Sequence, residues 1–332
     1  MTKELKNMNR KIILSFLLSG LILLNSCQKD VDLFTPNGNP IGADTNWIST
    51  ISASSPIFEL KHSLNKEAII DSIDCTTGGT ILTRDGLAII LTPSSLVLPN
   101  GTPATGKVFV ETMLIRQKGD MIRMDKPTTS NNRILVSGGE VYIRIRKETE
   151  DLHLAPNKRI YVRYADPAPS TAMRLFYGDE SIPDRFNWIP NFDSSSIGFG
   201  TPNLPAYEFS TSNLHWINCD HFYDSTGLRT TVIASLPIDY TNANTAVYLV
   251  FHDINSLMTM YGDVASKRFM SAKVPAGKQV IVVSITKKGN NSYYLGHQSI
   301  TTALTGSVGS QVVPLSPQPT SSADIKAYLA TL

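Results

Sequence analysis

The stretch Val141-Tyr-Ile-Arg-Ile-Arg146 alternates apolar and polar side chains with a period of two. In an extended strand, successive side chains point to opposite faces. The aliphatic side chains of this stretch would therefore share one face, and Tyr142, Arg144 and Arg146 would share the other. The pattern predicts a half-buried β-strand within residues 134–147, with one face against a core and the other toward water.

Further segments rich in β-branched and aromatic residues lie on both sides of this strand and are separated by turn residues. They are 69–73, 79–83, 87–91, 107–115 and 159–164, then 207–209, 230–236, 246–251, 268–274, 279–286 and 293–300. The last two flank Lys287-Lys-Gly-Asn-Asn291, which is typical of a hairpin. Many short strands with frequent turns indicate an all-β fold of antiparallel sandwiches rather than alternating strands and helices.

The length of 332 residues suits more than one domain, and we expect two β-sandwich domains in tandem. The first would span residues 67–200 and the second 201–332, because Ser194-Ser-Ser and nearby Gly, Pro and Asn residues interrupt the strand pattern. The second would be a small sandwich of the transthyretin or immunoglobulin type. It would end in a helix over 321–332, which Ser321 or Ser322 can cap.

The first domain would open with Thr77-Gly-Gly-Thr-Ile-Leu-Thr-Arg-Asp-Gly-Leu-Ala-Ile-Ile-Leu-Thr-Pro93. Paired glycines permit a sharp strand entry, and Pro93 ends a strand because it lacks an N–H donor. With Gly106-Lys-Val-Phe-Val110, this segment resembles the start of ZU5-like domains, which implies a β-sandwich used mostly for scaffolding and interaction. Some ZU5 relatives cut themselves at His-Phe-Ser. Here Tyr223 replaces the serine, so self-cleavage is not expected.

Three other segments resemble uncharacterised Bacteroidota-type surface lipoproteins, a resemblance that brings no known activity. They are Ser137-Gly-Gly-Glu-Val-Tyr142, Arg174-Leu-Phe-Tyr-Gly-Asp-Glu180 and Leu214-His-Trp-Ile-Asn-Cys-Asp-His-Phe222. The resemblance supports a location in the cell envelope.

Residues 1–26 have the form of a lipoprotein signal peptide. A basic start precedes an apolar run over 12–24, and Leu24-Asn-Ser-Cys27 ends it. The run is shorter than the about 20 residues of a membrane span, which favours an export signal. Its ending resembles a lipobox, which implies cleavage before Cys27 and a diacylglycerol on the thiol. Translation could start at Met1 or at Met8.

Cys27 would thus be a lipid anchor, followed by a flexible tether over 27–66 that is rich in Pro, Gly, Asn, Ser and Thr. Trp47 and Ile57 could dock part of this tether on the first domain. Gln28-Lys-Asp-Val-Asp32 resembles the acidic export signal of Bacteroidota-type lipoproteins, which implies transfer to the cell surface. We therefore expect a lipid-anchored outer-membrane protein at the cell surface, or alternatively on the periplasmic face.

The formal net charge of the chain is +2, and it becomes −1 once the basic signal peptide is removed. A near-neutral chain without a Lys/Arg cluster argues against nucleic acid as a partner. No second apolar run of about 18 residues is present. Membrane contact is therefore expected only through the lipid on Cys27.

Two cysteines, Cys75 and Cys219, remain after lipidation. In an oxidising compartment a disulfide between them is one option, and buried free thiols are the other. The stretch Asn218-Cys-Asp-His221 also holds the three groups that a cysteine hydrolase needs. In a strand, however, the thiol and the imidazole point to one side and the carboxylate to the other, so a structural role is favoured.

Metal and cofactor sites are not predicted. The six histidines are scattered, and no spacing typical of a zinc site is present. Gly200 and its neighbours are Pro-rich and do not open a helix, so no phosphate-binding loop is expected.

The leading functional prediction is a non-enzymatic binding or scaffold module for a protein or matrix partner. A glycan-binding accessory lipoprotein is the alternative, with Trp188, Trp216, Tyr293 and Tyr294 as stacking platforms. A hydrolase using Cys219 is the third. Coplanar exposed rings would favour glycans, an apolar patch or an open sheet edge would favour a protein partner, and a buried, unpaired Cys219 would exclude the hydrolase.

Overall fold

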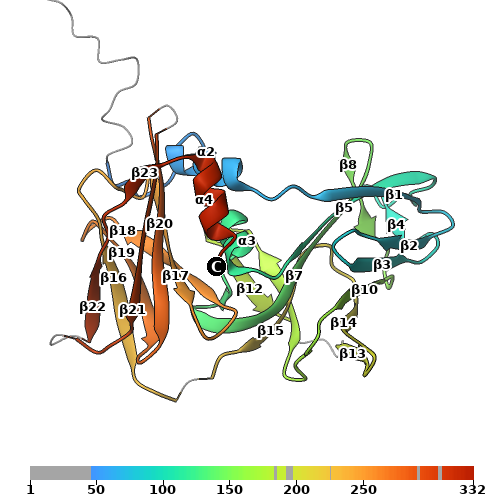
Figure 1. Cartoon of the computed structure of the whole chain (residues 1–332). Coiled ribbons are helices and arrows are strands. Elements are labelled where there is room, and N and C mark those ends of the chain that lie inside the picture. Colours follow the sequence, from blue (N-terminus) through green and yellow to red (C-terminus); the bar gives the residue numbers. More distant parts are fainter. Residues whose placement is uncertain (1–45, 183–184, 192–196, 225, 290–291, 306–308) are drawn as a thin grey trace, which may run out of the picture. The chain divides into compact units, whose positions relative to one another are not determined.

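The computed structural model describes residues 46–182, 185–191, 197–224, 226–289, 292–305 and 309–332. About 51% of the structure is strand and 8% is helix, and the strands form several antiparallel sheets (Figure 1). The predicted all-β fold with a short C-terminal helix is therefore confirmed. Within the described part of the chain, no helix has the length and apolar character needed to cross a membrane.

Sheets 1 and 2 form a β-sandwich. Sheet 1 runs in the order β1 (Ile69–Asp74), β5 (Lys107–Ile115), β7 (Arg133–Lys147), β15 (His215–Phe222), β11 (Arg174–Asp179) and β12 (Asn187–Pro190), with β6 (Thr129–Ser130) and β8 (Glu150–Asp151) paired to β7. Sheet 2 runs in the order β13 (Gly198–Thr201), β14 (Leu204–Thr211), β10 (Ile160–Ala165), β3 (Leu87–Leu91) and β2 (Gly79–Leu82). A separate small sheet pairs β4 (Leu96–Val97) with β9 (His153–Leu154).

The sandwich core contains the aliphatic face of β7. Val141, Ile143 and Ile145 are at most 1% exposed, and they share one apolar cluster with Ile89 and Val162 of sheet 2. The intervening side chains of β7 are only partly buried, on the opposite face of sheet 1. Each buried aliphatic side chain contributes about 1.5–3 kcal/mol to folding. The strand predicted from alternation is therefore confirmed, and its apolar face is the one that packs against sheet 2.

Sheet 3 encloses a core of its own. It runs in the order β22 (Ser310–Pro314), β16 (Arg229–Ser235), β19 (Arg268–Pro275), β18 (Leu257–Asp263), β17 (Thr245–Phe251), β20 (Gln279–Lys288), β21 (Ser292–Thr301) and β23 (Gln318–Thr320). The two outermost strands are joined by residues 315–317 alone, and Gln311 of β22 donates to the Thr301 carbonyl of β21 at 3.2 Å. The sheet therefore curls until its edges approach each other, with Val247, Leu249 and Phe251 in its interior.

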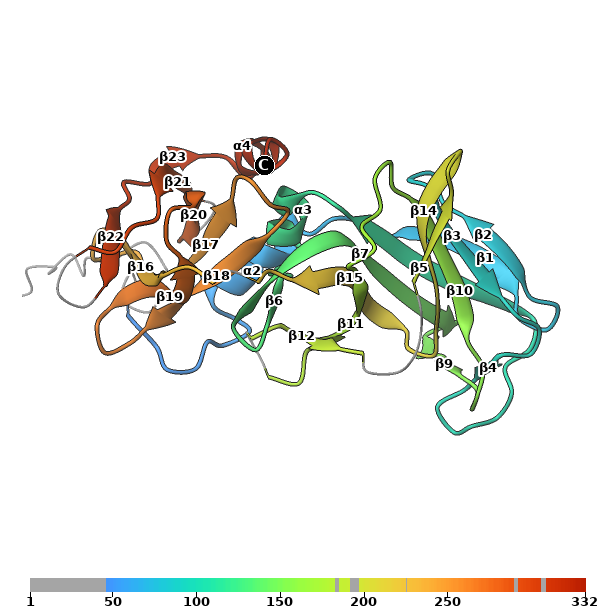
Figure 2. The ribbon, with the colours of Figure 1, turned by 90° about the horizontal axis from the view of Figure 1, so that it is seen from below.

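Three short helices pack in the seam between sheet 1 and the outer face of sheet 3 (Figures 1 and 2). They are α2 (Pro56–Leu64), α3 (Lys118–Arg123) and α4 (Ser322–Leu329). One apolar cluster contains Leu60, Met121 and Leu329 from these helices, together with Phe176 of sheet 1 and Tyr248 of sheet 3. The described residues consequently form a single packed unit.

The C-terminal helix begins as predicted. Ser321 accepts a hydrogen bond from the backbone of Asp324 at 3.0 Å, and the Asp324 carboxylate accepts one from the Ser321 backbone at 3.3 Å. This capping box satisfies N–H groups that have no partner inside a helix. Ile325 and Leu329 are fully buried on the seam side.

The C-terminal part of the predicted tether packs on the folded unit. Trp47 contacts the Phe269 ring of sheet 3 with centroids 4.9 Å apart, and Ile57 of α2 is only 3% exposed. Sequence analysis expected these two residues to dock on the first domain, but Trp47 packs on sheet 3, in the region predicted as the second domain. The predicted signal peptide and Cys27 lie outside the described residues.

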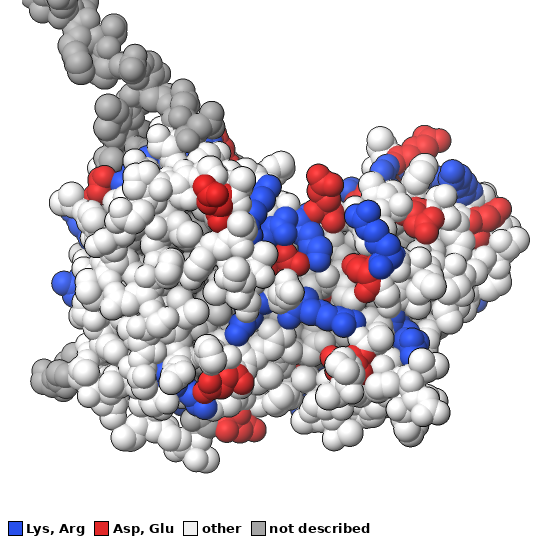
Figure 3. All heavy atoms as spheres, in the orientation of Figure 1, with Lys and Arg blue, Asp and Glu red and all other residues white. Residues whose placement is uncertain are grey.

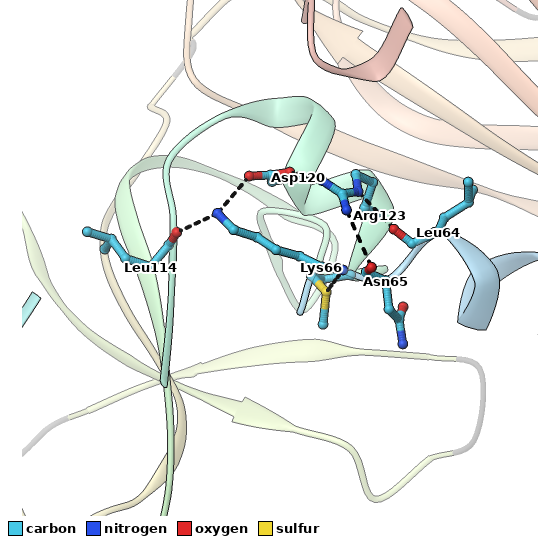
Figure 4. Close-up of polar contacts among 7 residues, drawn as sticks. Leu64, Asn65, Lys66, Leu114, Asp120 and Arg123 are labelled. Atoms are coloured by element: carbon cyan, nitrogen blue, oxygen red, sulfur yellow. Dashed lines mark hydrogen bonds and ion pairs between the residues drawn. The ribbon is translucent and has the colours of Figure 1, made fainter. Parts of the chain in front are cut away.

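A polar clamp joins the end of α2 to α3 (Figure 4). The Lys66 ammonium donates to Asp120 at 2.9 Å and to the Leu114 carbonyl at 3.1 Å. The Arg123 guanidinium donates to the Leu64 carbonyl at 2.8 Å and to Asp120 at 2.9 Å. The last carbonyls of a helix have no partner within it, so Arg123 satisfies one of them and binds the chain after α2 to α3.

The expected domain boundary at residues 200 and 201 needs correction. Thr201 and Leu204 pair across a two-residue turn that joins β13 to β14, and β14 and β15 complete sheets 2 and 1. Gly200 has φ +67°, and a Cβ there would meet the Leu204 carbonyl oxygen at 2.3 Å. The Gly- and Pro-rich composition therefore serves a tight hairpin inside the sandwich, because turns and linkers favour the same residues.

Candidate ligand-binding pocket

A polar pocket of about 630 Å³ opens at one end of sheet 1. Its lining comes from the turn between β6 and β7, from the starts of β7 and β11, and from the ends of β12 and β15. The lining residues are Ser130, Asn131, Arg133, Ala172, Arg174, Pro190, His221, Phe222 and Asp224. A concave site with a few convergent polar groups is the kind of place where proteins bind ligands.

The β6–β7 turn shapes the rim of this pocket. Asn131 and Asn132 have φ values of +48° and +63°, the left-handed conformation that a two-residue hairpin turn requires and that asparagine tolerates. The Asn187 side chain accepts a hydrogen bond from the Asn131 backbone at 2.8 Å. The turn is thereby held against β12, and Arg133, the next residue, enters the pocket.

Arg133 lies on an aromatic ring. Its guanidinium is 3.6 Å from the Phe222 centroid, and Phe222 packs edge-on against the buried Phe176 at 5.4 Å. The ion pair between Arg133 and Asp224 is long, at 3.5 Å, and both side chains are more than half exposed. Such a pair contributes little, about 0–1 kcal/mol, so the ring contact is what positions the guanidinium.

Arg174 supplies a second cation. It pairs in register with Asp220 of β15, so its place at the pocket follows from the pairing of β11 with β15. Its exposed guanidinium has no hydrogen bond or ion pair with any described residue. Among the described lining residues there are therefore two guanidinium groups and the single carboxylate of Asp224, an excess of positive charge.

His221 does not add to that charge at neutral pH. Its ring nitrogen Nδ1 lies 3.4 Å from the Met173 sulfur, and burial lowers the pKa of the imidazole, although the Asp224 carboxylate acts in the opposite direction. The histidine therefore presents a neutral ring to the pocket, whereas the arginines keep their charge at any physiological pH.

The hydrolase prediction finds no support in this arrangement. Cys219 is 1% exposed and belongs to the sandwich core, on the side of β15 away from Asn218 and Asp220. Burial raises the pKa of its thiol to about 12. A thiol that stays protonated is a poor nucleophile, and the nitrogen of His221 contacts Met173 rather than Cys219.

The two cysteines considered for a disulfide, Cys75 and Cys219, are free and fully buried in the same core. Burial raises the pKa of the Cys75 thiol as well. They behave as small apolar core residues.

The predicted stacking residues are not free platforms. Trp188 is fully buried and donates to the Pro127 carbonyl at 3.0 Å. Trp216 lines a shallower groove of about 340 Å³, together with two histidines, but it is only 5% exposed. Tyr293 packs beside the seam cluster, and Tyr294 packs against Tyr240 at 5.8 Å. These rings do not form a coplanar exposed pair.

Elsewhere several charged side chains form ion pairs, and on the face drawn in Figure 3 Lys and Arg side chains lie among Asp and Glu side chains. Arg146 and Glu111 are 2.6 Å apart on neighbouring strands, and Arg144 pairs with Asp151 at 2.7 Å. Arg174 differs from these paired arginines because it has no counterion among the described residues.

Sequence reasoning missed Arg133 and Arg174, which lie 41 residues apart and meet only through strand pairing. The double asparagine before Arg133 was the local signal of a turn that could have drawn attention to it. Among the described residues, no group of three or more His, Cys, Asp and Glu side chains is arranged to hold a metal ion. Comparison with protein-family models, curated proteins and solved structures found no match for this chain.

Proposed function

We propose that this chain is a lipid-anchored binding module of the cell envelope, and that it holds an acidic segment of a partner protein in the pocket between Arg133 and Arg174. The anchor is the diacylglycerol on Cys27, at the outer membrane and on the cell surface. The observation that carries the proposal is the excess of guanidinium groups over carboxylates in the pocket.

Guanidinium groups suit this role because their fixed N–H donors match the two oxygens of a carboxylate. Arg133 is held in place by the Phe222 ring, so a ligand would not have to order it. Arg174 is exposed and has no competing partner among the described residues. Hydrogen bonds to charged groups contribute about 1.5–3 kcal/mol each, so losing one arginine is expected to weaken binding about 10- to 100-fold.

A protein ligand is favoured over a glycan by the aromatic residues. Sugar binding generally needs a free ring face. Among the described lining residues, the Phe222 ring has the Arg133 guanidinium against it, and the His221 ring contacts the Met173 sulfur. Of the four expected platforms, Trp188 and Trp216 are buried, Tyr293 packs beside the seam cluster, and Tyr294 packs against Tyr240. The proposal involves no catalysis, since Cys219 faces the core.

Binding can be tested with a labelled hexaglutamate peptide, using hexaglutamine as the neutral comparison. Arg174→Glu is expected to abolish binding, and Arg84→Glu is the matched control because Arg84 is exposed in a turn far from the pocket in the sheet order. Equal affinity of the wild type and Arg174→Glu for hexaglutamate would contradict the assignment of the pocket.

Display can be tested separately on intact cells by protease shaving of the wild type and of Cys27→Ala. Cleavage of the wild-type protein on intact cells, and its loss from the membrane fraction in Cys27→Ala, are the expected results. Protection of the wild type would refute surface exposure.

A further inference from the structure

A second polar site is buried in sheet 1, where β7 and β15 pair. Asn218 lies opposite Glu140, and Asp220 lies opposite Ser137. On β15, only one residue lies between Asn218 and Asp220. On β7, two residues, Gly138 and Gly139, lie between their partners Glu140 and Ser137, so β7 bulges at this point. The bulge places four polar side chains on one patch of the sheet.

These four residues are connected. The Ser137 hydroxyl donates to Asn218 Oδ1 at 3.1 Å, and Asn218 Nδ2 donates to Asp220 Oδ2 at 2.7 Å. Asn218 also faces Glu140 directly across the strand pair. Glu140, Asn218 and Asp220 are all 0% exposed, and Ser137 is 5% exposed. The cluster therefore has essentially no access to solvent.

Three carboxylate oxygens in this cluster have no hydrogen-bond partner: both of Glu140 and Oδ1 of Asp220. Buried polar atoms are rarely left unsatisfied, and an isolated buried carboxylate is strongly unfavourable. Burial raises the pKa of both groups, and the charge of Asp220 raises that of Glu140 further. The two acids therefore lie near each other and lack a compensating charge.

Two basic residues come into question, and neither supplies that charge. Arg174 lies opposite Asp220 on β11 but donates no hydrogen bond to a described residue. The charge of Lys126 lowers the pKa of Glu140, but only as the smallest of the three influences on that group. The Lys126 ammonium instead pairs with Glu180 at 2.8 Å and lies 4.2 Å from the Phe186 ring. It donates no hydrogen bond to Glu140. A cation of another kind is needed if both carboxylates are ionised.

We propose that the cluster of Ser137, Glu140, Asn218 and Asp220 binds one calcium ion. The ligands available are the four carboxylate oxygens, Asn218 Oδ1 and the Ser137 hydroxyl oxygen, which reach the lower end of the about six to eight oxygens that calcium takes. Two carboxylates balance its charge. Magnesium fits less well, because it keeps several waters and demands near-octahedral geometry, and this cluster is closed to solvent.

A calcium ion at this site would hold β7 against β15 at the bulge. Its ligand Asp220 lies next to His221 and two residues before Phe222, and both of these residues line the pocket. The site rests on a different set of side chains from the proposed ligand pocket. Each can therefore be tested without the other.

The test uses the full chain, purified without chelator and again after EGTA treatment. Mass spectrometry of metal content is expected to find about one calcium per untreated chain, and calcium is expected to raise the melting temperature of the EGTA-treated chain by about 5 °C. Glu140→Gln should bind no calcium and show no such shift. Glu208→Gln, which removes a half-buried carboxylate paired with Arg163 at 2.8 Å on sheet 2, should behave as the wild type.

A wild-type chain without bound calcium, whose melting temperature is the same in calcium and in EGTA, would overturn the proposal. Infrared spectroscopy of the wild type adds a measurement that needs no variant. If the spectrum measured in the presence of calcium shows a protonated carboxyl band, the proposal is also contradicted, since the two acids would then be neutralised by protons. Loss of that band on calcium addition supports the site.

Discussion

Asp125 is the residue whose replacement should most clearly reveal how the seam is held. Its carboxylate follows α3 and accepts hydrogen bonds from the Lys61 ammonium of α2 at 2.7 Å and from the Tyr248 hydroxyl of sheet 3 at 2.8 Å. Tyr248 is fully buried, so its hydroxyl cannot turn to water instead. One carboxylate thus ties two helices to the outer face of sheet 3.

The substitution Asp125→Asn keeps the shape of the side chain and removes its charge. One carboxamide oxygen cannot serve both donors as the two carboxylate oxygens do, and hydrogen bonds to charged groups contribute about 1.5–3 kcal/mol. We expect the free energy of unfolding to fall by about 2 kcal/mol at neutral pH. Urea denaturation followed by tryptophan fluorescence measures this difference.

The effect should depend on pH. Burial alone would raise the pKa of Asp125, but the Lys61 charge, the hydrogen bonds from Lys61 and Tyr248, and the charge of Lys126 outweigh it and lower the pKa. A lowered pKa stabilises the fold above the unfolded-state value of about 3.9, and that stabilisation is lost as the pH falls through the folded-state value. The difference between wild type and Asp125→Asn should therefore shrink in acid.

A control separates this half-buried contact from an ordinary surface ion pair. Asp151→Asn removes a carboxylate that is 42% exposed and pairs with Arg144 at 2.7 Å, and it should cost less than about 1 kcal/mol. Equal losses for Asp125→Asn and Asp151→Asn at neutral pH would refute the reasoning. The reasoning would also be refuted if the free energy of unfolding lost in Asp125→Asn were the same at about pH 3 as at neutral pH.

Three further predictions concern the helices and the buried thiols. Gly119→Ala places a Cβ 1.7 Å from the Leu329 carbonyl oxygen and should lower the free energy of unfolding by about 3 kcal/mol. The expected results are a lower urea midpoint and faster proteolysis after α4. Ser321→Ala removes the cap of α4 and should lower the free energy of unfolding by about 1 kcal/mol, whereas Ser321→Asp should preserve it. Iodoacetamide should leave Cys75 and Cys219 unmodified in the native chain at pH ~8 and label both in denaturant; rapid native labelling of Cys219 would contradict its place in the core.

Much of the fold could be predicted because it depends on local patterns. The alternation over 141–146 identified a strand and its buried face, and Ser321 with the apolar residues after it identified the last helix. The extent of the sandwich could not be predicted in this way. The turn at Gly200 has the composition of a linker, and only the pairing of β14 and β15 with earlier strands shows that the chain returns to complete the same two sheets.

The candidate sites were less predictable, because they depend on register. Arg133 and Arg174 reach one pocket only through the order β7, β15, β11. Ser137 shares a face with Glu140 and Asp220 only because β7 has an extra residue at its bulge. Sequence analysis assigned Cys219, His221 and Asp220 to sides of a strand, but it could not know which side faces the core.

The sequence by itself determined the all-β class, the alternation of buried and exposed positions along residues 141–146 and the capped C-terminal helix, because side-chain direction in a strand and capping at a helix end depend on neighbours in the chain. The tertiary structure alone decided that residues 69–222 form one sandwich and that sheet 3 closes on itself. It also decided which buried acids and exposed arginines lie together. Those features come from pairing between strands far apart in sequence, where one inserted residue changes every contact beyond it.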